Sequence, residues 1–137
     1  MPYFTDIQPL YDCLIELFDR LMEDPAIKAK ALDSKLIVLF NYRDPEGQLW
    51  IDCTGSDVKL TPGAQEMTAD ATLTMDTDVA HRFWLGKLNL IKSLTSEEIE
   101  SEGSVPKLLK LLPVIKPAFK IYPEILEEKG LGSIVDV

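Results

Sequence analysis

The residues of this chain that could take part in chemistry are few and widely spaced. The only histidine is His81, and Asp78 stands three residues before it. An imidazole near a carboxylate can act as a general base, but covalent catalysis also requires a nucleophile within its reach. Residues three apart are neighbours on one helix face, so the spacing favours an ordinary surface pair. We therefore predict no catalytic residue and do not expect an enzyme.

Other reactive side chains show no functional spacing either. The acidic run Glu97–Glu102 lacks the ordered spacing of a calcium loop and is interpreted as a solvated charge run. Cys13 and Cys53 have neither metal-binding nor redox spacing, so both are predicted to be small buried hydrophobic residues. Glycine-rich phosphate loops and zinc-binding histidine motifs are absent from the sequence. The sequence thus predicts neither a metal nor a cofactor.

Composition indicates one globular domain over residues 1–137. Hydrophobic residues make up 46% of the chain and charged residues 27%, which is typical of a soluble protein with its own core. The net charge of −9 argues against nucleic acid as a partner. No apolar run approaches the roughly 20 residues that span a bilayer, and Met1–Phe4 does not resemble a signal peptide. We therefore expect a cytoplasmic protein.

The charge is unevenly distributed along the chain. Residues 1–103 carry 9 Lys and Arg against 19 Asp and Glu, whereas residues 104–137 carry 5 against 4. Four lysines lie in a segment without acidic residues: Lys107, Lys110, Lys116 and Lys120. They either form an ordinary solvated helix face or contact an anionic head group or a membrane.

The first half of the chain alternates between helical and strand patterns. Apolar spacing predicts an amphipathic helix over 7–22, and Asp24-Pro25 reads as the cap and first residue of a second helix over 26–32. The run 35–42 is interpreted as a central strand buried on both faces. Strands over 48–54 and 58–61 then complete an antiparallel meander, which the strand 71–76 is expected to extend.

The stretch 69–103 has the clearest local signals. Strict alternation predicts the strand Ala71–Asp76, with Thr77 and Asp78 as cap candidates for a helix over 79–85 that ends at Gly86. After an apolar run over 88–94, an acidic strand is expected to end at Gly103 with positive φ.

Prolines break up the C-terminal part. Pro106 suits the first turn of a helix over 105–112 that Ser104 can cap, and later prolines predict short helical turns joined by kinks. We expect a last helical turn over 124–129. Ile134-Val135 could then join a sheet edge or dock on a neighbouring segment.

Four of these pieces, in this order, resemble the sterol carrier protein type 2 family. They are Ala69–Met75, Gly86-Lys87-Leu88-Asn89, Ile99–Gly103 and Val105–Leu112. The resemblance covers 34–112, preceded by leading helices over 1–33 and followed by a proline-rich extension over 113–137. It implies an α/β (α+β) fold, in which a largely antiparallel sheet of about five strands is covered on one face by helices around an apolar tunnel.

The function that the resemblance implies is non-catalytic binding and transfer of a lipid, with at most transient membrane contact. A flexible fatty acyl chain fits such a tunnel more readily than a sterol ring system. The predicted pocket residues are Phe83, Trp84, Leu88, Leu94, Leu108, Leu111, Leu112, Ile115 and Phe119. The alternative is an interaction module that uses the same apolar surface to bind a partner enzyme or to form a homodimer.

Overall fold

The computed structural model describes residues 3–137 and leaves positions 1–2 of the predicted domain outside the described residues. The first half contains two helices and four strands: α1 (Gln8–Leu21), α2 (Pro25–Ser34), β1 (Ile37–Arg43), β2 (Gly47–Asp52), β3 (Lys59–Pro62) and β4 (Ala71–Asp76). The second half is mostly helical: α3 (Thr77–Trp84), α4 (Leu90–Thr95), β5 (Glu100–Gly103), α5 (Val105–Leu109), α6 (Leu112–Ile115), α7 (Ala118–Glu128) and the 3-10 helix η1 (Gly132–Ile134).

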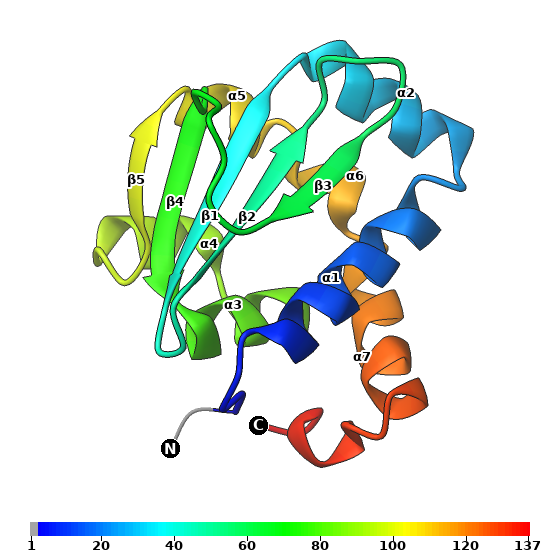
Figure 1. Cartoon of the computed structure of the whole chain (residues 1–137), viewed down its shortest axis with the longest axis vertical. Helices are drawn as coiled ribbons and strands as arrows, with labels where there is room; N and C mark the ends of the chain where they lie inside the picture. The colour runs from blue at the N-terminus through cyan, green and yellow to red at the C-terminus, as the bar shows by residue number, and fades with distance from the viewer. Residues whose placement is uncertain (1–2) are drawn as a thin grey trace.

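The five strands form one mixed sheet in the order β3-β2-β1-β4-β5 (Figure 1). All neighbours are antiparallel except β1 and β4, which are parallel. The largely antiparallel sheet is confirmed, but the expectation that β4 extends the meander beyond β3 is wrong. β3 ends in Pro62, which has no N–H to give to a further strand, and is therefore suited to the sheet edge. β4 lies on the other side of β1 instead.

Asp70 joins three segments at the start of β4. Its backbone N–H donates to Ile37 O (2.7 Å), and its carboxylate Oδ2 accepts from Ile37 N (2.8 Å). Its carbonyl oxygen accepts from Ser104 N (2.7 Å), just beyond β5. This residue therefore aligns β4 with β1 and with the strand on its other side.

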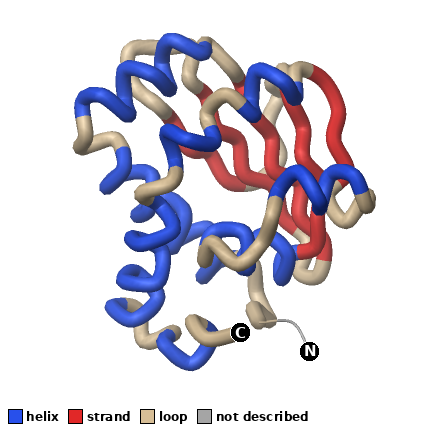
Figure 2. The backbone as a smooth tube through the Cα atoms, turned by 180° about the vertical axis from the view of Figure 1, so that it is seen from behind, coloured by secondary structure: helices blue, strands red, loops and turns tan. Residues whose placement is uncertain are grey.

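Helices cover one face of the sheet, as Figure 2 shows from behind. The β3–β4 connection crosses the front of the sheet in Figure 1. Along β1 the side chains of Val38, Phe40 and Tyr42 are buried, whereas Leu39 and Asn41 on the opposite face are only half-buried. The prediction that this strand is buried on both faces is therefore wrong, because helices pack on one face alone.

Local signals account for the first two helices. Pro9 lies in the first turn of α1, where its missing N–H breaks no intrahelical hydrogen bond. The Asp24 carboxylate caps α2 by accepting from Ala26 N (2.9 Å) and Ile27 N (3.4 Å). The predicted bounds of the two helices, 7–22 and 26–32, are confirmed to within two residues at each end.

The start of α3 differs from the predicted cap. α3 begins at Thr77 without any side-chain cap hydrogen bond. The Thr77 hydroxyl donates instead to Pro45 O (2.9 Å), and the Asp78 carboxylate accepts from Tyr3 N (2.8 Å). Long-range partners have replaced the local role that these two side chains would have had in an isolated helix.

His81 is fully buried, so the predicted surface pair with Asp78 is wrong. Its Nδ1 lies 2.8 Å from Tyr122 Oη in α7, and its Nε2 lies 2.7 Å from Ile134 O. Because a carbonyl only accepts, Nε2 carries the proton and Nδ1 accepts from the tyrosine hydroxyl. The tail 131–137 is thus held against α3 and α7, and it does not join the sheet edge.

The C-terminal helices are partly longer than the prolines suggest. α5 and α6 are single short turns, but α7 has 11 residues, continues through Pro123 and begins six residues before the expected turn at 124–129. Tyr122, Ile125 and Leu126 of α7 are fully buried, and α7 lies along α1 (Figure 1). Packing against α1 therefore compensates for the hydrogen bond that Pro123 removes. In the part of the chain that the structure describes, no helix is long and apolar enough to cross a membrane.

Gly103 gives the first testable prediction. It ends β5 with φ of +83°, as expected, and a Cβ there would overlap the Asp70 carbonyl oxygen. Changing Gly103 to Val should lower the free energy of unfolding by at least about 3 kcal/mol, since backbone strain and a clash add. The matched control is Gly63→Val, also at positive φ but with nothing within 4 Å of the added atom. It should cost only about 1–2 kcal/mol of strain. Equal losses for both variants in urea denaturation would contradict the steric argument.

His81 gives the second prediction. Burial lowers the pKa of native His81 below its ordinary value of 6.5. As the pH falls, the unfolded chain therefore takes up this proton before the native protein does, and the native state loses stability. The free energy of unfolding should be at its full value above about pH 6.5 and should decrease as the pH falls below that value toward the lowered native pKa. Because this is the only histidine, the His81→Gln variant should lose that slope. Parallel pH profiles for the two proteins would rule out His81 as its origin.

Candidate ligand-binding cavity

An apolar cavity of about 80 Å³ lies between the covered face of the sheet and the helices. Every residue in its wall is hydrophobic, including one cysteine. They are Phe18, Met22, Ile27, Ala31, Val38, Phe40, Ile51, Cys53, Val58, Leu73, Met75, Phe83, Trp84, Leu90, Ile99, Leu108, Leu111, Leu112, Val114 and Ile115. The wall holds no charged group that would orient a polar ligand.

The two parallel strands supply the centre of the floor. Phe40 of β1 faces Leu73 of β4 in the register, and Val38 and Met75 lie on the same face. These four side chains are at most 7% exposed. Because successive residues of a strand point to opposite faces, the alternation of β1 and β4 directs them all toward the helices.

The wall opposite the sheet comes from α5 and α6 and the turns beside them. It contains five aliphatic residues that are only half-buried: Leu108, Leu111, Leu112, Val114 and Ile115. Neither helix has a fully buried residue, and they are 5 and 4 residues long. This wall is therefore held by fewer buried contacts than the floor.

Two aromatic residues of α3 form part of the cavity wall. Phe83 and Trp84 are 8% and 2% exposed, and their ring centroids are 4.9 Å apart. Trp84 packs edge-on against Phe18 of α1 (5.6 Å) and Phe40 of β1 (6.2 Å). α3 thus connects the leading helix to the sheet through one aromatic cluster.

The structure brings six of the nine predicted pocket residues into this wall: Phe83, Trp84, Leu108, Leu111, Leu112 and Ile115. Leu88, Leu94 and Phe119 are half-buried against the core outside it. Phe119 stands behind Phe83, with ring centroids 5.8 Å apart, and supports that side chain from α7. Contact of any of the nine with a ligand remains a prediction.

Sequence reasoning missed the wall residues of α1, α2 and the strands. Phe18 belongs to an apolar helix stripe, Val38 to a continuous apolar run and Leu73 to an alternating strand, and all three patterns predict burial. The same pattern describes residues packed solidly in a core, such as Leu14 and Leu49. Whether such a residue lines a cavity or fills the core depends on how the apolar segments are placed relative to one another in the fold.

The described residues offer little for catalysis near this cavity. Burial raises the pKa of the Cys53 thiol to about 11, so it is a poor nucleophile. Cys13 is buried and free as predicted, and burial likewise raises the pKa of its thiol to about 11. Within residues 3–137, no group of three or more His, Cys, Asp and Glu side chains is placed to hold a metal ion.

The predicted acidic run is on the surface. Glu97, Glu98, Glu100 and Glu102 are all exposed. Two of them pair with arginines: Glu98 Oε2 lies 3.2 Å from Arg82, and Glu100 Oε1 lies 3.7 Å from Arg43. These exposed pairs are the solvated charge run that the sequence indicates.

The four lysines of the predicted head-group site also lie outside the cavity. Lys107, Lys110, Lys116 and Lys120 are exposed along the α5–α7 segment, and none forms an ion pair within the described residues. They alternate with the leucines and isoleucines that form the half-buried wall.

Solved structures share this arrangement of sheet and helices. Sterol Carrier Protein 2 from Yarrowia lipolytica in its apo form is 19% identical, with a TM-score of 0.60 over 77% of this chain and 88% of that chain. The UbiJ-SCP2 ubiquinone synthesis protein is 20% identical, with a TM-score of 0.61 over 84% of this chain and 96% of that chain. At these identities the likeness shows the fold.

The same fold also occurs within an enzyme. The sec-alkylsulfatase Pisa1 from Pseudomonas sp. is 15% identical, with a TM-score of 0.55 over 63% of this chain but only 14% of that chain. The similar part is therefore a small share of the sulfatase. No curated protein sequence matches this chain significantly.

The family assignment comes from the sequence itself. The model of the SCP-2 sterol transfer family matches residues 15–116, a range that includes 34–112 and extends into α1. Domains of this family generally bind or transfer lipids and are typically non-catalytic. With about three quarters of its length matched and the corresponding fold, this chain belongs to the SCP-2 sterol transfer family.

Proposed function

We propose that this protein binds one aliphatic lipid chain in the apolar cavity, without catalysis, and exchanges it with a membrane. The observation that carries the proposal is the wall of the cavity. It contains no charged residue, although its side chains come from the helices α1 to α6, the strands β1, β2 and β4, and the loops beside them. A ligand without polar groups along its length matches such a wall, because no buried polar atom would be left unpaired.

The cavity must enlarge to hold such a ligand. Its volume of about 80 Å³ is smaller than the roughly 150 Å³ in which an engineered protein cavity binds benzene. α5 and α6 are the wall that can move at least cost, since helices this short are marginal without packing and neither has a fully buried residue. Their displacement would open the tunnel that the sequence predicts.

This mode of opening favours a fatty acyl chain over a sterol. A flexible chain occupies space gradually as side chains and short helices give way, whereas a rigid ring system needs its full width at once. Each buried methylene contributes about 0.8 kcal/mol, so a chain of about a dozen carbons supplies about 10 kcal/mol before the costs of binding.

The four lysines support a membrane contact on the same side. The rest of the chain, residues 1–103, has 10 more acidic than basic residues and would be repelled by an anionic bilayer. Lys107, Lys110, Lys116 and Lys120 are exposed on the segment that forms the movable wall. Contact with anionic lipid, worth about 1 kcal/mol per lysine, would therefore place that wall at the membrane surface.

The interaction module is the second candidate. The likeness to the UbiJ-SCP2 ubiquinone synthesis protein and to part of a sulfatase supports it. Such a module would present an apolar patch of several hundred Å². Among large hydrophobic side chains in residues 3–137, those exposed are Ile91 (53%) and Val137 (38%). Since most apolar surface points inward, we favour the carrier.

Filling the cavity tests the proposal directly. Ala31 of α2 is 8% exposed and lines the cavity, whereas Ala29 of the same helix is exposed. Native mass spectrometry should find about one fatty acyl ligand per wild-type chain after incubation with fatty acyl lipid. Ala31→Phe should weaken binding at least about tenfold, since displacing two methylenes already removes about 1.6 kcal/mol. Ala29→Phe should bind as the wild type does. A ligand-free wild type that forms dimers would favour the interaction module instead.

The lysines are tested separately. Changing all four to Gln should reduce sedimentation with phosphatidylserine liposomes to the low level seen for the wild type at high salt. The matched control changes four other exposed lysines, Lys30, Lys35, Lys59 and Lys92, and removes the same charge. Liposome binding that depends neither on the salt concentration nor on the four substitutions would show that these lysines do not dock the protein on anionic membranes.

A further inference from the structure

A surface groove of about 320 Å³ lies beside the cavity, between α1, α2 and β3. We call it the α1–β3 groove. Its outer part contains four charged residues, Asp19, Glu23, Lys28 and Asp57, and two apolar ones, Ile15 and Leu60. Its inner part is formed by Phe18, Met22 and Val58, and these same three side chains also line the cavity. These three residues therefore form a common boundary between the groove and the cavity.

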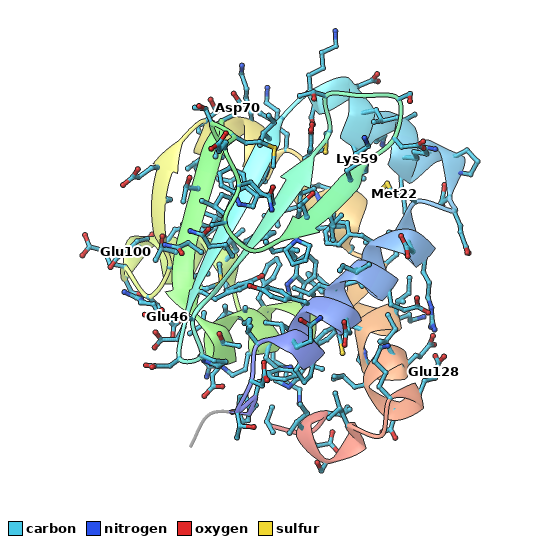
Figure 3. The ribbon with its side chains drawn as sticks, in the orientation of Figure 1. Met22, Glu46, Lys59, Asp70, Glu100 and Glu128 are labelled. Atoms are coloured by element: carbon cyan, nitrogen blue, oxygen red, sulfur yellow. The ribbon has the colours of Figure 1, made fainter. Side chains whose placement is uncertain are left out.

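Two of the three shared side chains, Met22 and Val58, are suited to moving aside, whereas Phe18 is packed against Trp84. Met22 follows the last residue of α1 and is half-buried, at the α1–α2 corner (Figure 3). Its unbranched thioether chain changes rotamer easily, and Val58 lies in the loop before β3. Passage from groove to cavity would then require rotation of these side chains, and displacement of α5 and α6 would enlarge the cavity that receives the ligand.

An ion pair spans the outer part of the groove. Lys28 Nζ of α2 donates to Asp57 Oδ1 in the β2–β3 loop, and the two side chains are 36% and 65% exposed. This hydrogen bond lowers the pKa of Asp57, so its carboxyl group is ionised at neutral pH. The pair connects two segments of the groove wall that are 29 residues apart in the chain.

We propose that the α1–β3 groove is the entrance through which ligands reach the cavity, and that the Lys28–Asp57 ion pair obstructs this entrance. The inference rests on the proposed lipid binding but concerns the route of the ligand. The pair touches the entrance and does not line the cavity, so it should control the rate of exchange and leave affinity unchanged.

The charges of the groove determine which probe can test this. Asp19 and Glu23 line the groove, and neither forms an ion pair within residues 3–137. They would repel a carboxylate on its way in. The probe is therefore the methyl ester of cis-parinaric acid, an uncharged fatty acyl chain whose fluorescence rises in apolar surroundings.

Stopped-flow fluorescence with this probe should separate rate from affinity. In Lys28→Gln and in Asp57→Asn, the association and dissociation rate constants should both rise about twofold to fivefold, the factor expected when an exposed ion pair is broken. The Kd should stay within about twofold of the wild-type value, since neither side chain contacts the bound probe. Added salt should speed exchange in the wild type and have little effect in the variants.

The control is Glu98→Gln, which breaks the Arg82–Glu98 pair (37% and 38% exposed), whose residues do not line the groove. Its rates should match those of the wild type. If all four proteins exchange the probe at one rate, the entrance is elsewhere. The measured Kd of the probe would then still support the proposed lipid binding. If Lys28→Gln and Asp57→Asn change the Kd but not the association rate, the ion pair is part of the binding site and does not obstruct the entrance. A wild type that does not bind the probe overturns the proposed function and this inference with it.

Discussion

The parallel pairing of β1 with β4 is the constraint on which the rest of this structure depends. Asp70 sets it by binding both the N–H and the carbonyl of Ile37, while its own carbonyl accepts from Ser104. The label in Figure 3 shows its place at the end of the sheet where β4 begins. Because β4 lies at the centre beside β1, the apolar faces of both strands form one continuous floor. The acidic strand β5 is left at the exposed edge, where charged side chains oppose pairing with another chain.

The helices on this floor differ in how firmly they are held. α1 and α7 pack on each other, and each contains fully buried residues such as Leu14 and Ile125. The hydrogen bonds of His81 connect α7 and the tail to α3. α5 and α6 lack any fully buried residue. A small cavity between a rigid floor and a loosely held wall is suited to admit a flexible apolar ligand, because enlargement disturbs little of the core.

Charge is separated from this interior and divided between two surfaces. The wall of the cavity has none, the α5–α7 segment carries the lysines, and the α1–β3 groove carries more acid than base. In our proposal the ligand is therefore held by burial alone. Charged groups act on where the protein meets a membrane and on how fast the ligand exchanges, since neither process needs a charge inside the cavity.

The sequence by itself determined the features that depend on neighbouring residues. The cap of α2 at Asp24, the alternation of β4, the positive φ of Gly103 and the order of motifs that indicates the family all follow from local patterns. Tertiary structure decided which strand β4 pairs with, the burial of His81 and the new partners of Thr77 and Asp78. It also decided which apolar residues line a cavity and which fill the core. These depend on groups more than 30 residues apart, and periodicity, which reports only the direction in which a side chain points, does not specify what it meets.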